Sequence, residues 1–438
     1  INAAPAYEKF IRAEMNNNGK ITVYDTTGLK RVNVVVMDTG VNPDNARINF
    51  ATDSEGNKLA FDYTTPVSTG HGYHGTSVAG VISSKWNDPN NTAKVNGVAP
   101  NAKIIDWMID KTGQCSISAD CQGMTTDRLN KIKDLNARIY NLSWKFYGYD
   151  KKESSYQYAD KWDYKPDKTT NNFDLTFTTN DFWSAFLKNL ATKDSVLVLA
   201  SGNDRKSTNT QLLSAAPLTS TFGKGNTYDL TNRLIVAVAA QLTDSGDIYG
   251  QASYSNGCGI AAGWCLTAPA GVKNESNNTD TRIITTSYTG NGLSRFSGTS
   301  AAAPVISGSL AFVMGAYPYL TAQQAVEILF RSANKDFTGW TNKKNTLSDW
   351  TDSFGNVYQV GTMFGHGVVD LGAATQPLGI TKIATTAAGA QSAAISSLSK
   401  TAATQTKLAL PRALNSALTI SLPQTMMGLD DYNRPFAV

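Results

Sequence analysis

The sequence predicts an α/β fold of three layers, in which a mostly parallel central sheet is flanked by helices on both faces. Near-continuous apolar runs, such as 32–38, alternate along the chain with segments of helical spacing, such as 299–317. Parallel strands covered on both faces give such runs because neither face meets water. The chain has 438 residues, of which 41% are hydrophobic and 17% charged, which is enough apolar surface for a sizeable core.

Each expected element follows from its local pattern. The strands are short apolar runs, expected at 31–38, 102–109, 137–143, 195–203 and 232–240. The helices have apolar residues at helical spacing and are expected at 74–84, 125–136, 180–193, 299–317 and 321–333. Two regions break this alternation. Residues 145–183 are dense in Tyr, Trp, Lys and Asp and suggest a surface insertion, whereas 379–438 are rich in Ala, Ser and Thr and suggest a linker or docking segment.

Charge and cysteine spacing exclude some classes of protein. The formal net charge of +4 gives no electrostatic case for nucleic acid as the main partner. The four cysteines fall in two close pairs, Cys115 with Cys121 and Cys258 with Cys265, and neither pair has metal-ligand neighbours in the sequence. Two local disulfides would suit an oxidising compartment, and four buried free thiols are the alternative.

Asp38 ends an apolar run and is followed at once by Thr39 and Gly40. A carboxylate at the end of a buried strand has three interpretations. It belongs to a carboxyl protease that pairs it with a second such turn, or it holds a histidine in a serine hydrolase, or it caps a turn. A second turn of the required type exists at 244–246, but polar residues precede Asp244 where a buried strand would be expected.

His74 and Ser300 each begin a helix of small residues. A charged imidazole is disfavoured at a helix N-terminus, so His74 would stay neutral, as a general base must before it accepts a proton. A serine at such an end has backbone N–H groups near it that favour a developing negative charge. A structural histidine and an N-cap serine are the alternatives for the two motifs taken alone.

Asn203 is the last residue of the expected strand 195–203. An asparagine there could point its amide into a cleft at the carboxyl ends of the strands, where open α/β sheets bind ligands. A simple turn residue is the alternative.

Four motifs, VVVMDTGV, HGTSVAGVI, LASGN and SGTSAAAP, stand in this order along the chain. Together they resemble the signatures of the subtilisin-like serine proteases, or subtilases. The resemblance implies that Asp38 orients and supports His74, that His74 acts as general base and then acid, and that Ser300 is the nucleophile. It also implies that Asn203 donates to the oxyanion together with the Ser300 N–H.

The same resemblance implies a subtilisin-like peptidase domain over 30–378, with residues 1–29 packed on it. Six residues would line the substrate cleft: Leu142, Ser143 and Trp144 on one side, and Ala200, Ser201 and Gly202 on the other. One departure is Ser77, where many subtilases have a second histidine, although the triad does not require it.

A narrower resemblance concerns YSNGCGIAAGWCLTAPAG and the closing LDDYNRPFAV, which look like parts of autotransporter subtilases. It implies a monomeric passenger that is exported through the periplasm to the bacterial outer membrane or beyond and acts on proteins or peptides. Residues 379–438 would then be a tail that precedes a translocator barrel.

No cofactor is expected for the chemistry, but subtilases often bind calcium. Asp44, Asn87 and Asp88 offer oxygen ligands suited to that ion, and the same composition also makes an ordinary solvated loop. Two other functions remain open: an adhesin that keeps the triad as a relic, and an esterase that uses the same triad.

Overall fold

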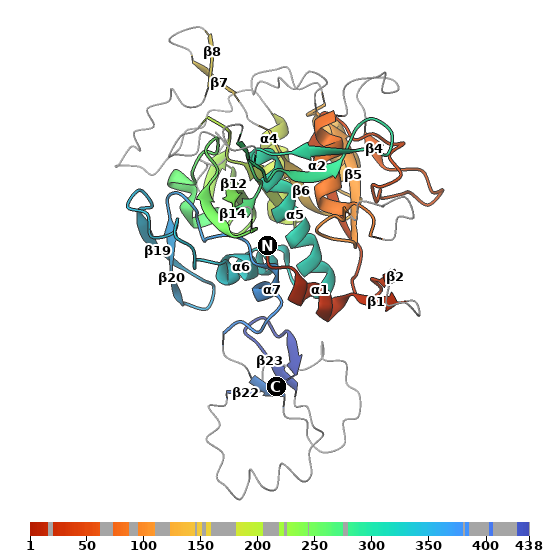
Figure 1. The fold of residues 1–438 in the computed structure, drawn as a ribbon. Coiled ribbons are helices and arrows are strands. Elements are labelled where there is room, and N and C mark those ends of the chain that lie inside the picture. The colour runs from red at the N-terminus through yellow and green to blue at the C-terminus, as the bar shows by residue number, and fades with distance from the viewer. Residues whose placement is uncertain are drawn as a thin grey trace, which may run out of the picture.

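A computed structural model gives the arrangement of the chain (Figure 1). The structure describes residues 1–15, 21–61, 73–86, 95–109, 123–144, 147–150, 155–158, 181–204, 219–222, 226–243, 245–274, 279–379, 382–384, 403–405 and 427–437. Within them an eight-stranded sheet runs in the order β13-β12-β9-β6-β3-β5-β4, with β14 also paired to β12. All its strand pairs are parallel except β12 with β13, so the predicted mostly parallel α/β fold is confirmed.

The five strands predicted from apolar runs all lie in this sheet. The sheet consists of β3 (Val32–Asp38), β4 (Ala60–Phe61), β5 (Ala102–Met108), β6 (Ala137–Leu142), β9 (Val196–Ala200), β12 (Leu234–Leu242), β13 (Ile248–Gln251) and β14 (Cys265–Pro269). The short strands β4, β13 and β14 were not predicted, because runs of two to five residues carry little periodic signal.

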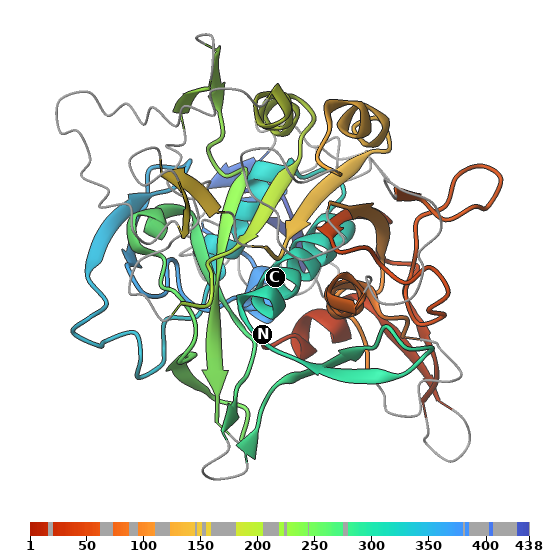
Figure 2. The ribbon, with the colours of Figure 1, turned by 90° about the horizontal axis from the view of Figure 1, so that it is seen from above.

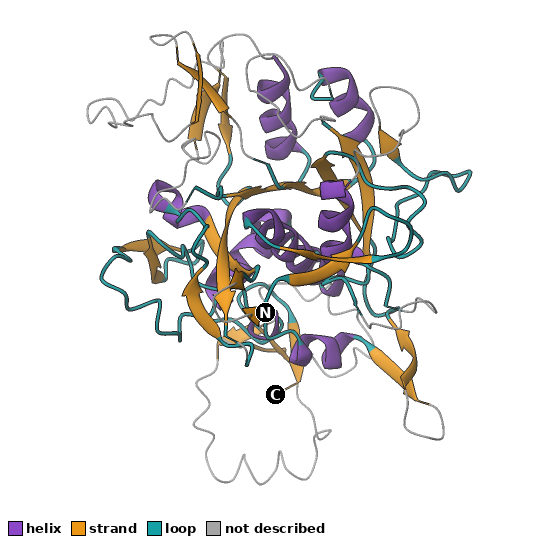
Figure 3. Cartoon of the chain, turned by 45° about the horizontal axis from the view of Figure 1, so that its top comes forward, coloured by secondary structure: helices purple, strands orange, loops and turns teal. Residues whose placement is uncertain are grey.

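Helices cover both faces of the sheet (Figures 2 and 3). The helices are α1 (Ala4–Phe10), α2 (Tyr73–Ser83), α3 (Thr126–Ile132), α4 (Asp181–Thr192), α5 (Thr299–Ala316), α6 (Ala322–Ser332), α7 (Leu371–Ala374) and the 3-10 helix η3 (Gly259–Trp264). Alternate residues of β3 face opposite layers. Val34 packs in the core with α2, α5 and α6, whereas Val35 packs in the core with α3 and α4. The apolar run of β3 is therefore continuous because each face has its own helical cover.

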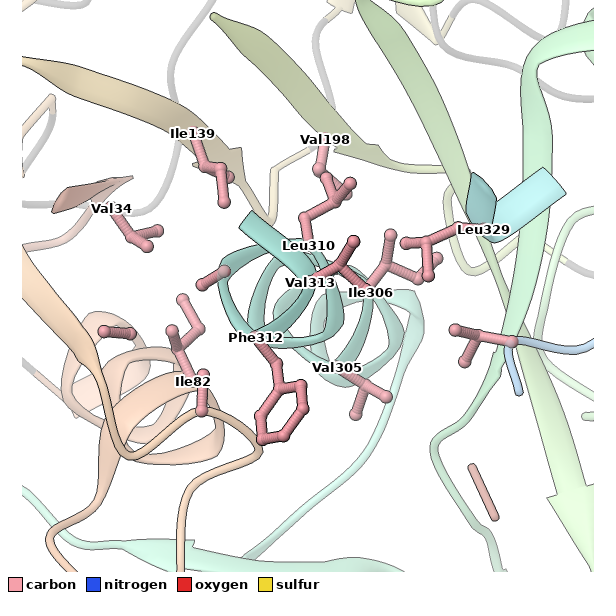
Figure 4. Close-up of a cluster of buried hydrophobic side chains, with 14 of the residues drawn as sticks. Val34, Ile82, Ile139, Val198, Val305, Ile306, Leu310, Phe312, Val313 and Leu329 are labelled. Atoms are coloured by element: carbon pink, nitrogen blue, oxygen red, sulfur yellow. The ribbon is translucent and has the colours of Figure 1, made fainter. Parts of the chain in front are cut away.

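Helix α5 forms the centre of the larger core (Figure 4). Its residues from Ala301 to Gly315 are all buried, and its side chains meet strands, α2 and α6 around its circumference. By length and a mean hydropathy of 1.4, α5 is the one helix among the described residues that could cross a membrane, but 89% of it is buried in the structure. That burial is typical of a core helix in a globular domain.

The carboxyl ends of β3, β6 and β9 lie side by side at one edge of the sheet, because these strands are parallel neighbours. Asp38 is the last residue of β3, Ser143 follows β6, and Asn203 follows β9. Open α/β sheets bind their ligands at this edge.

Several two-stranded ribbons extend from this core and interrupt no predicted element. They are β1 (Arg12–Met15) with β2 (Ile21–Asp25), β7 (Tyr147–Asp150) with β8 (Ser155–Tyr158), β10 (Thr219–Phe222) with β11 (Asn226–Asp229), β15 (Lys273–Asn274) with β16 (Thr279–Asp280), β17 (Ile283–Thr286) with β18 (Leu293–Phe296), and β19 (Leu347–Thr351) with β20 (Val357–Gly361). Most of the predicted insertion at 145–183 lies outside the described residues, so its role stays a prediction.

Both end regions of the chain pack on the domain. In α1, Tyr7 donates through its hydroxyl to the Val98 carbonyl at 2.9 Å and lies edge-on to Phe312 of α5. Near the other end, β21 (Lys382–Ala384), β22 (Ala403–Gln405), β23 (Met427–Leu429) and β24 (Pro435–Ala437) form a small antiparallel sheet. Tyr432 and Phe436 there belong to the same core cluster as α5.

A buried ion pair fixes this last stretch. Arg434 is fully buried, and its Nη2 lies 2.6 Å from Asp430 Oδ2. The same guanidinium donates to the carbonyl of Ala374, at the end of α7, and to that of Gln376. The described part of 379–438 therefore includes a docked segment at 427–437, which is the second of the two interpretations offered for this region.

Candidate active site

Asp38 is fully buried at the end of β3. A buried carboxylate is costly unless donors surround it, and here the Thr39 N–H donates to Asp38 Oδ1 at 2.7 Å. His74 Nδ1 lies 2.8 Å from Oδ1 and 3.0 Å from Oδ2 of the same side chain. Because an ionised carboxylate can only accept, Nδ1 carries the proton of the neutral ring, and Nε2 keeps the lone pair.

His74 lies in the first turn of α2, and 34% of its side chain is exposed. Its ring meets the ring of Phe296 edge-on, with centroids 5.3 Å apart. Burial lowers the pKa of His74, but the negative charge and hydrogen bond of Asp38 raise it, and the net direction is upward from the ordinary value of 6.5. The Asp38 carboxylate therefore makes this imidazole a stronger base than a free histidine.

The short contact between β3 and α2 requires a glycine after His74. A Cβ on Gly75 would overlap the carbonyl oxygen of Gly40 and would lie 3.1 Å from Asp38 Cβ. The Gly75 N–H also donates to Thr39 Oγ1 at 3.2 Å. The absent side chain thus permits the approach that joins Asp38 to His74.

Ser300 lies in the first turn of α5, after Gly298, which has a φ of 94°. The Ser300 hydroxyl donates to the carbonyl oxygen of Ser143 at 3.0 Å, and the Ser143 hydroxyl donates back to the Ser300 carbonyl at 3.0 Å. Within the described residues, no hydrogen bond joins Ser300 Oγ to His74. A serine hydroxyl has one hydrogen, so it cannot donate to His74 while it donates to Ser143.

Asn203 is exposed in the turn that follows β9. Its amide oxygen accepts from the Thr299 N–H at 2.9 Å and from Thr299 Oγ1 at 3.0 Å. Because both donors bond to the amide oxygen, that oxygen faces Thr299 at the start of α5. The NH₂ group of Asn203 is not used in these two bonds. The asparagine amide therefore lies beside the helix end that carries Ser300, with its orientation set by the residue before Ser300.

The strand order brings these groups to one place. Ser143, which contacts Ser300, follows β6, and β6 lies between the strand that ends in Asp38 and the strand that precedes Asn203. Helices α2 and α5 also pack against each other. The Asp38–His74 pair, Ser300 and Asn203 are thus gathered at the carboxyl edge of the sheet.

The residues expected to line a substrate cleft are buried. Their side chains expose between 0% and 7% of their surface for Leu142, Ser143, Trp144, Ala200 and Ser201, and Gly202 has no side chain. Leu142 in particular packs in the core with α3 and α4. Contacts from these segments to a peptide would therefore come from the backbone rather than from the side chains.

Of the two disulfides expected from the sequence, the structure describes one. Cys258 and Cys265 form a disulfide, with Cα atoms 5.8 Å apart, that closes the short η3 segment. Both residues are fully buried. Cys115 and Cys121 lie outside the described residues, so their pairing stays a prediction.

Two of the three candidate calcium ligands lie outside the described residues. Asn87 and Asp88 are not among the described residues, and Asp44 is exposed. In the described part of the chain, no three His, Cys, Asp or Glu side chains gather as a metal site would need. Calcium near Asp44 therefore stays a prediction.

The other histidines lie apart from this site or outside the description. His71 is not among the described residues. His366 is buried and stacked on Phe330 with centroids 4.0 Å apart, and its Nε2 lies 2.9 Å from the Gly263 carbonyl oxygen. Burial lowers the pKa of His366 to about 3, so this ring stays neutral and structural at ordinary pH.

Three contributors to the site were not predicted. Phe296 packs on His74, Thr299 orients the Asn203 amide, and Asn256 bonds to the turn that contains Asn203. Thr299 stands inside the SGTSAAAP motif, which could have signalled it. Phe296 ends the short strand β18 and Asn256 lies in a loop, and neither place has a periodic pattern that would mark a contact.

Comparisons with known proteins bear on the family and the fold of the chain. The Subtilase family model, Peptidase_S8, matches residues 30–367. No curated protein matches the chain. Among solved structures, the serine protease of Aeromonas sobria is similar, with a TM-score of 0.50 and 20% identity over 83% of this chain and 65% of that chain. This chain thus matches less than two thirds of the Aeromonas protein.

Two further solved structures are similar at lower scores. The epidermin leader peptide processing serine protease from Staphylococcus aureus has a TM-score of 0.47 and 20% identity, over 79% of this chain and 76% of that chain. Fervidolysin from Fervidobacterium pennivorans, a keratinolytic enzyme related to subtilisin, has a TM-score of 0.45 and 19% identity. The match covers 81% of this chain and 44% of fervidolysin.

Proposed function

Because the chain belongs to the subtilase family and is a serine peptidase, we propose that Asp38, His74 and Ser300 form its catalytic triad. The observation that carries the proposal is the pairing of His74 Nδ1 with the Asp38 carboxylate, 2.8 Å away, at the sheet edge where α5 begins. This pairing leaves Nε2 with the lone pair that a general base needs.

The proposed reaction begins when the Ser300 hydroxyl leaves the Ser143 carbonyl and donates to His74 Nε2. Ser300 Oγ then attacks the peptide carbonyl carbon as Nε2 takes its proton. The resulting imidazolium is stabilised by the adjacent Asp38 carboxylate. His74 next protonates the leaving amine, the C–N bond breaks, and an acyl-enzyme remains. Water repeats the sequence, with His74 again as base and then as acid, and releases the carboxylic acid and free Ser300.

The proposed oxyanion hole combines Asn203 and the Ser300 backbone N–H. The Asn203 amide oxygen is bonded to Thr299, which leaves the NH₂ group as the available donor. The Ser300 N–H belongs to the first turn of α5, where backbone N–H groups lack helical acceptors. Both donors are set before the reaction, so they stabilise the tetrahedral intermediate without reorganising.

We also propose that the protein acts outside the cytoplasm on proteins or peptides, as a monomer. The buried Cys258–Cys265 disulfide supports an oxidising compartment. The finer proposal, an autotransporter passenger in which the tail at 379–438 precedes a translocator barrel, rests on the sequence resemblance alone. Detection of the protein in the culture medium, compared with the cell fractions, would test its location.

An active-site phosphonate that reacts with activated serines tests the proposed function. We expect the wild-type protein to be labelled at Ser300 and to degrade casein. A peptide-library profile would then define the preferred residues. A protein that binds a surface but takes up no label would support the adhesin, and ester turnover without casein cleavage would support the esterase.

Replacing Asn203 with Leu should lower kcat by about 10²–10³, the range known for loss of one oxyanion donor in subtilisin. The leucine cannot donate to the developing negative charge, whereas the binding of the substrate ground state is little changed. Steady-state kinetics on a chromogenic peptide, normalised by active-site titration, would measure the effect. An unchanged kcat would remove Asn203 from the oxyanion hole.

Activity should fall as the pH drops through the pKa of His74, because only the neutral imidazole accepts the serine proton. Since Asp38 holds that pKa above the ordinary value of 6.5, the half-maximal point of the acid limb should lie above pH 6.5. The measurement is kcat/KM of the free enzyme from pH 5 to 9. A flat profile between pH 5 and 8 would contradict the assignment of His74 as the base.

A further inference from the structure

A short segment, Tyr254–Asn256, lies between the two turns that carry the proposed oxyanion donors. We call it the bridging segment. At one end Asn256 contacts the turn 201–204, which contains Asn203. At the other end Tyr254 contacts Gly298, two residues before Ser300. No step of the proposed reaction uses either residue, so these contacts need an explanation of their own.

Asn256 makes an unusually complete set of hydrogen bonds to the turn 201–204. Its Nδ2 donates to the Ser201 carbonyl at 3.1 Å and to Asp204 Oδ2 at 3.2 Å. Its Oδ1 accepts from the Asp204 N–H at 3.1 Å. Its own N–H donates to the Gly202 carbonyl at 2.9 Å, and its carbonyl accepts from Ser201 Oγ at 3.0 Å. Every residue of the turn except Asn203 is therefore bonded to Asn256.

This arrangement fixes the backbone around Asn203 without touching its amide. Asn256 is fully buried, whereas Asn203 is exposed. Gly202 has a φ of 101°, a conformation that an unsupported turn would leave easily. The bonds on either side of Asn203 hold this turn in place, and Thr299 then orients the amide itself.

Tyr254 performs the corresponding task on the nucleophile side. Its hydroxyl accepts from the Gly298 N–H at 3.0 Å and donates to the Gly271 carbonyl at 2.7 Å. Burial raises the pKa of Tyr254 to about 12, so the hydroxyl keeps its proton throughout the range in which the enzyme would work. Gly298 is the N-cap of α5, and its position sets where the first helical N–H groups point.

The bridging segment is itself anchored. Ser255 Oγ accepts from the Ala239 N–H of β12 at 3.1 Å, and the Gln251 side chain donates to the Ser255 carbonyl at 3.0 Å. Two residues after Asn256, Cys258 enters the disulfide with Cys265. The segment is thus tied to the central sheet and to a covalent crosslink, and it can act as a rigid reference for both turns.

We propose that the bridging segment is a positioning element, in which Asn256 and Tyr254 hold the Asn203 amide and the Ser300 N–H at the separation that an oxyanion requires. The inference rests on the proposed function, because it needs Asn203 to be an oxyanion donor. Neither residue touches the substrate. Their effect is on the placement of the donors, and a misplacement of about 1 Å can cost about 10² in rate.

A double-mutant cycle tests this inference. Asn256→Leu keeps the branching and the number of side-chain heavy atoms but removes the donors and the acceptor, and we expect kcat to fall about 10²-fold while KM stays within about twofold. Since Asn256 acts through Asn203, the variant with both Asn203→Leu and Asn256→Leu should be no slower than Asn203→Leu alone, within about threefold. The half-maximal pH on the acid side of the kcat/KM profile should not change, because the Asp38–His74 pair is untouched.

Tyr254→Phe is the second variant, because it keeps the packing and removes only the hydroxyl. It should lower kcat about tenfold with little change in KM, and it decides the question if Asn256→Leu yields no folded protein. The control is Asn345→Leu. Asn345 is also buried and bridges two backbone groups, the Trp340 carbonyl and the Met363 N–H, but it lies next to the β19–β20 ribbon. It should leave kcat per titrated site unchanged.

The outcomes separate the two levels of inference. If Asn203→Leu lowers kcat but Asn256→Leu and Tyr254→Phe do not, the bridging segment is not a positioning element. The same conclusion follows if the losses from Asn203→Leu and Asn256→Leu multiply, or if Asn345→Leu is as harmful as Asn256→Leu. If Asn203→Leu itself leaves kcat unchanged, the oxyanion assignment fails, and the inference that rests on it is overturned as well.

Discussion

Replacing Ser300 with Ala should lower kcat about 10⁶-fold, the loss that follows removal of the triad serine in subtilisin. Without Oγ no acyl-enzyme can form, and only the weak catalysis supplied by the oxyanion hole and by substrate binding remains. The measurement is turnover of a chromogenic peptide and labelling by the phosphonate. The variant should still fold, since the hydrogen bond that Ser300 Oγ donates to the Ser143 carbonyl is worth about 1 kcal/mol.

A matched control is available on the same helix. Ser309 is fully buried in α5, and its hydroxyl donates to the Val305 carbonyl at 2.9 Å. Ser309→Ala removes an equivalent hydroxyl from the helix interior and should leave kcat unchanged. If Ser300→Ala retains wild-type turnover or is still labelled at an activated serine, the nucleophile is a different residue and the proposed triad is wrong.

Asp38→Asn should lower kcat about 10⁴-fold with the fold intact, by analogy with the same change in the serine protease triad. An asparagine can direct its NH₂ group at His74 Nδ1, which favours the tautomer with the proton on Nε2. That tautomer cannot accept the serine proton. The variant also loses the negative charge that raises the pKa of His74, so the acid limb of its residual activity should move to lower pH.

The control for this variant is Asp106→Asn, because Asp106 is a buried carboxylate on β5, the strand next to β3. Its substitution should leave kcat and the acid limb unchanged. Pre-steady-state kinetics would show whether the lower kcat of Asp38→Asn arises in the acylation step, as we expect. Turnover close to that of the wild type, or an acid limb that stays in place, would show that Asp38 does not act on His74.

The fold was predictable where one physical rule dominates. Runs such as the one that forms β3 are buried on both faces, so they must be apolar throughout, and five of the eight sheet strands were identified in this way. Helix α5 was expected at 299–317 and occupies Thr299–Ala316, because its small residues suit a crowded core. The ribbons were not predicted, since their strands of two to five residues are too short to show a period.

The candidate site was predictable only in its principal residues. Asp38, His74, Asn203 and Ser300 stand out because each ends or follows an apolar strand or begins a helix. Asn256 and Tyr254 do not, because their partners in the two turns that carry the proposed oxyanion donors lie 44 to 55 residues away along the chain. Only the folded arrangement brings such partners together, and a single sequence carries no record of which loop meets which.

The placement of Tyr432 and Phe436 has a consequence for biosynthesis. Both side chains are buried in the same core as α5, the helix that bears Ser300. Synthesis proceeds from the N-terminus, so a nascent polypeptide on the ribosome contains Ser300 well before it contains these two aromatics. Helix α5, which carries the proposed nucleophile, therefore completes its packing only after residues 432–436 have been translated.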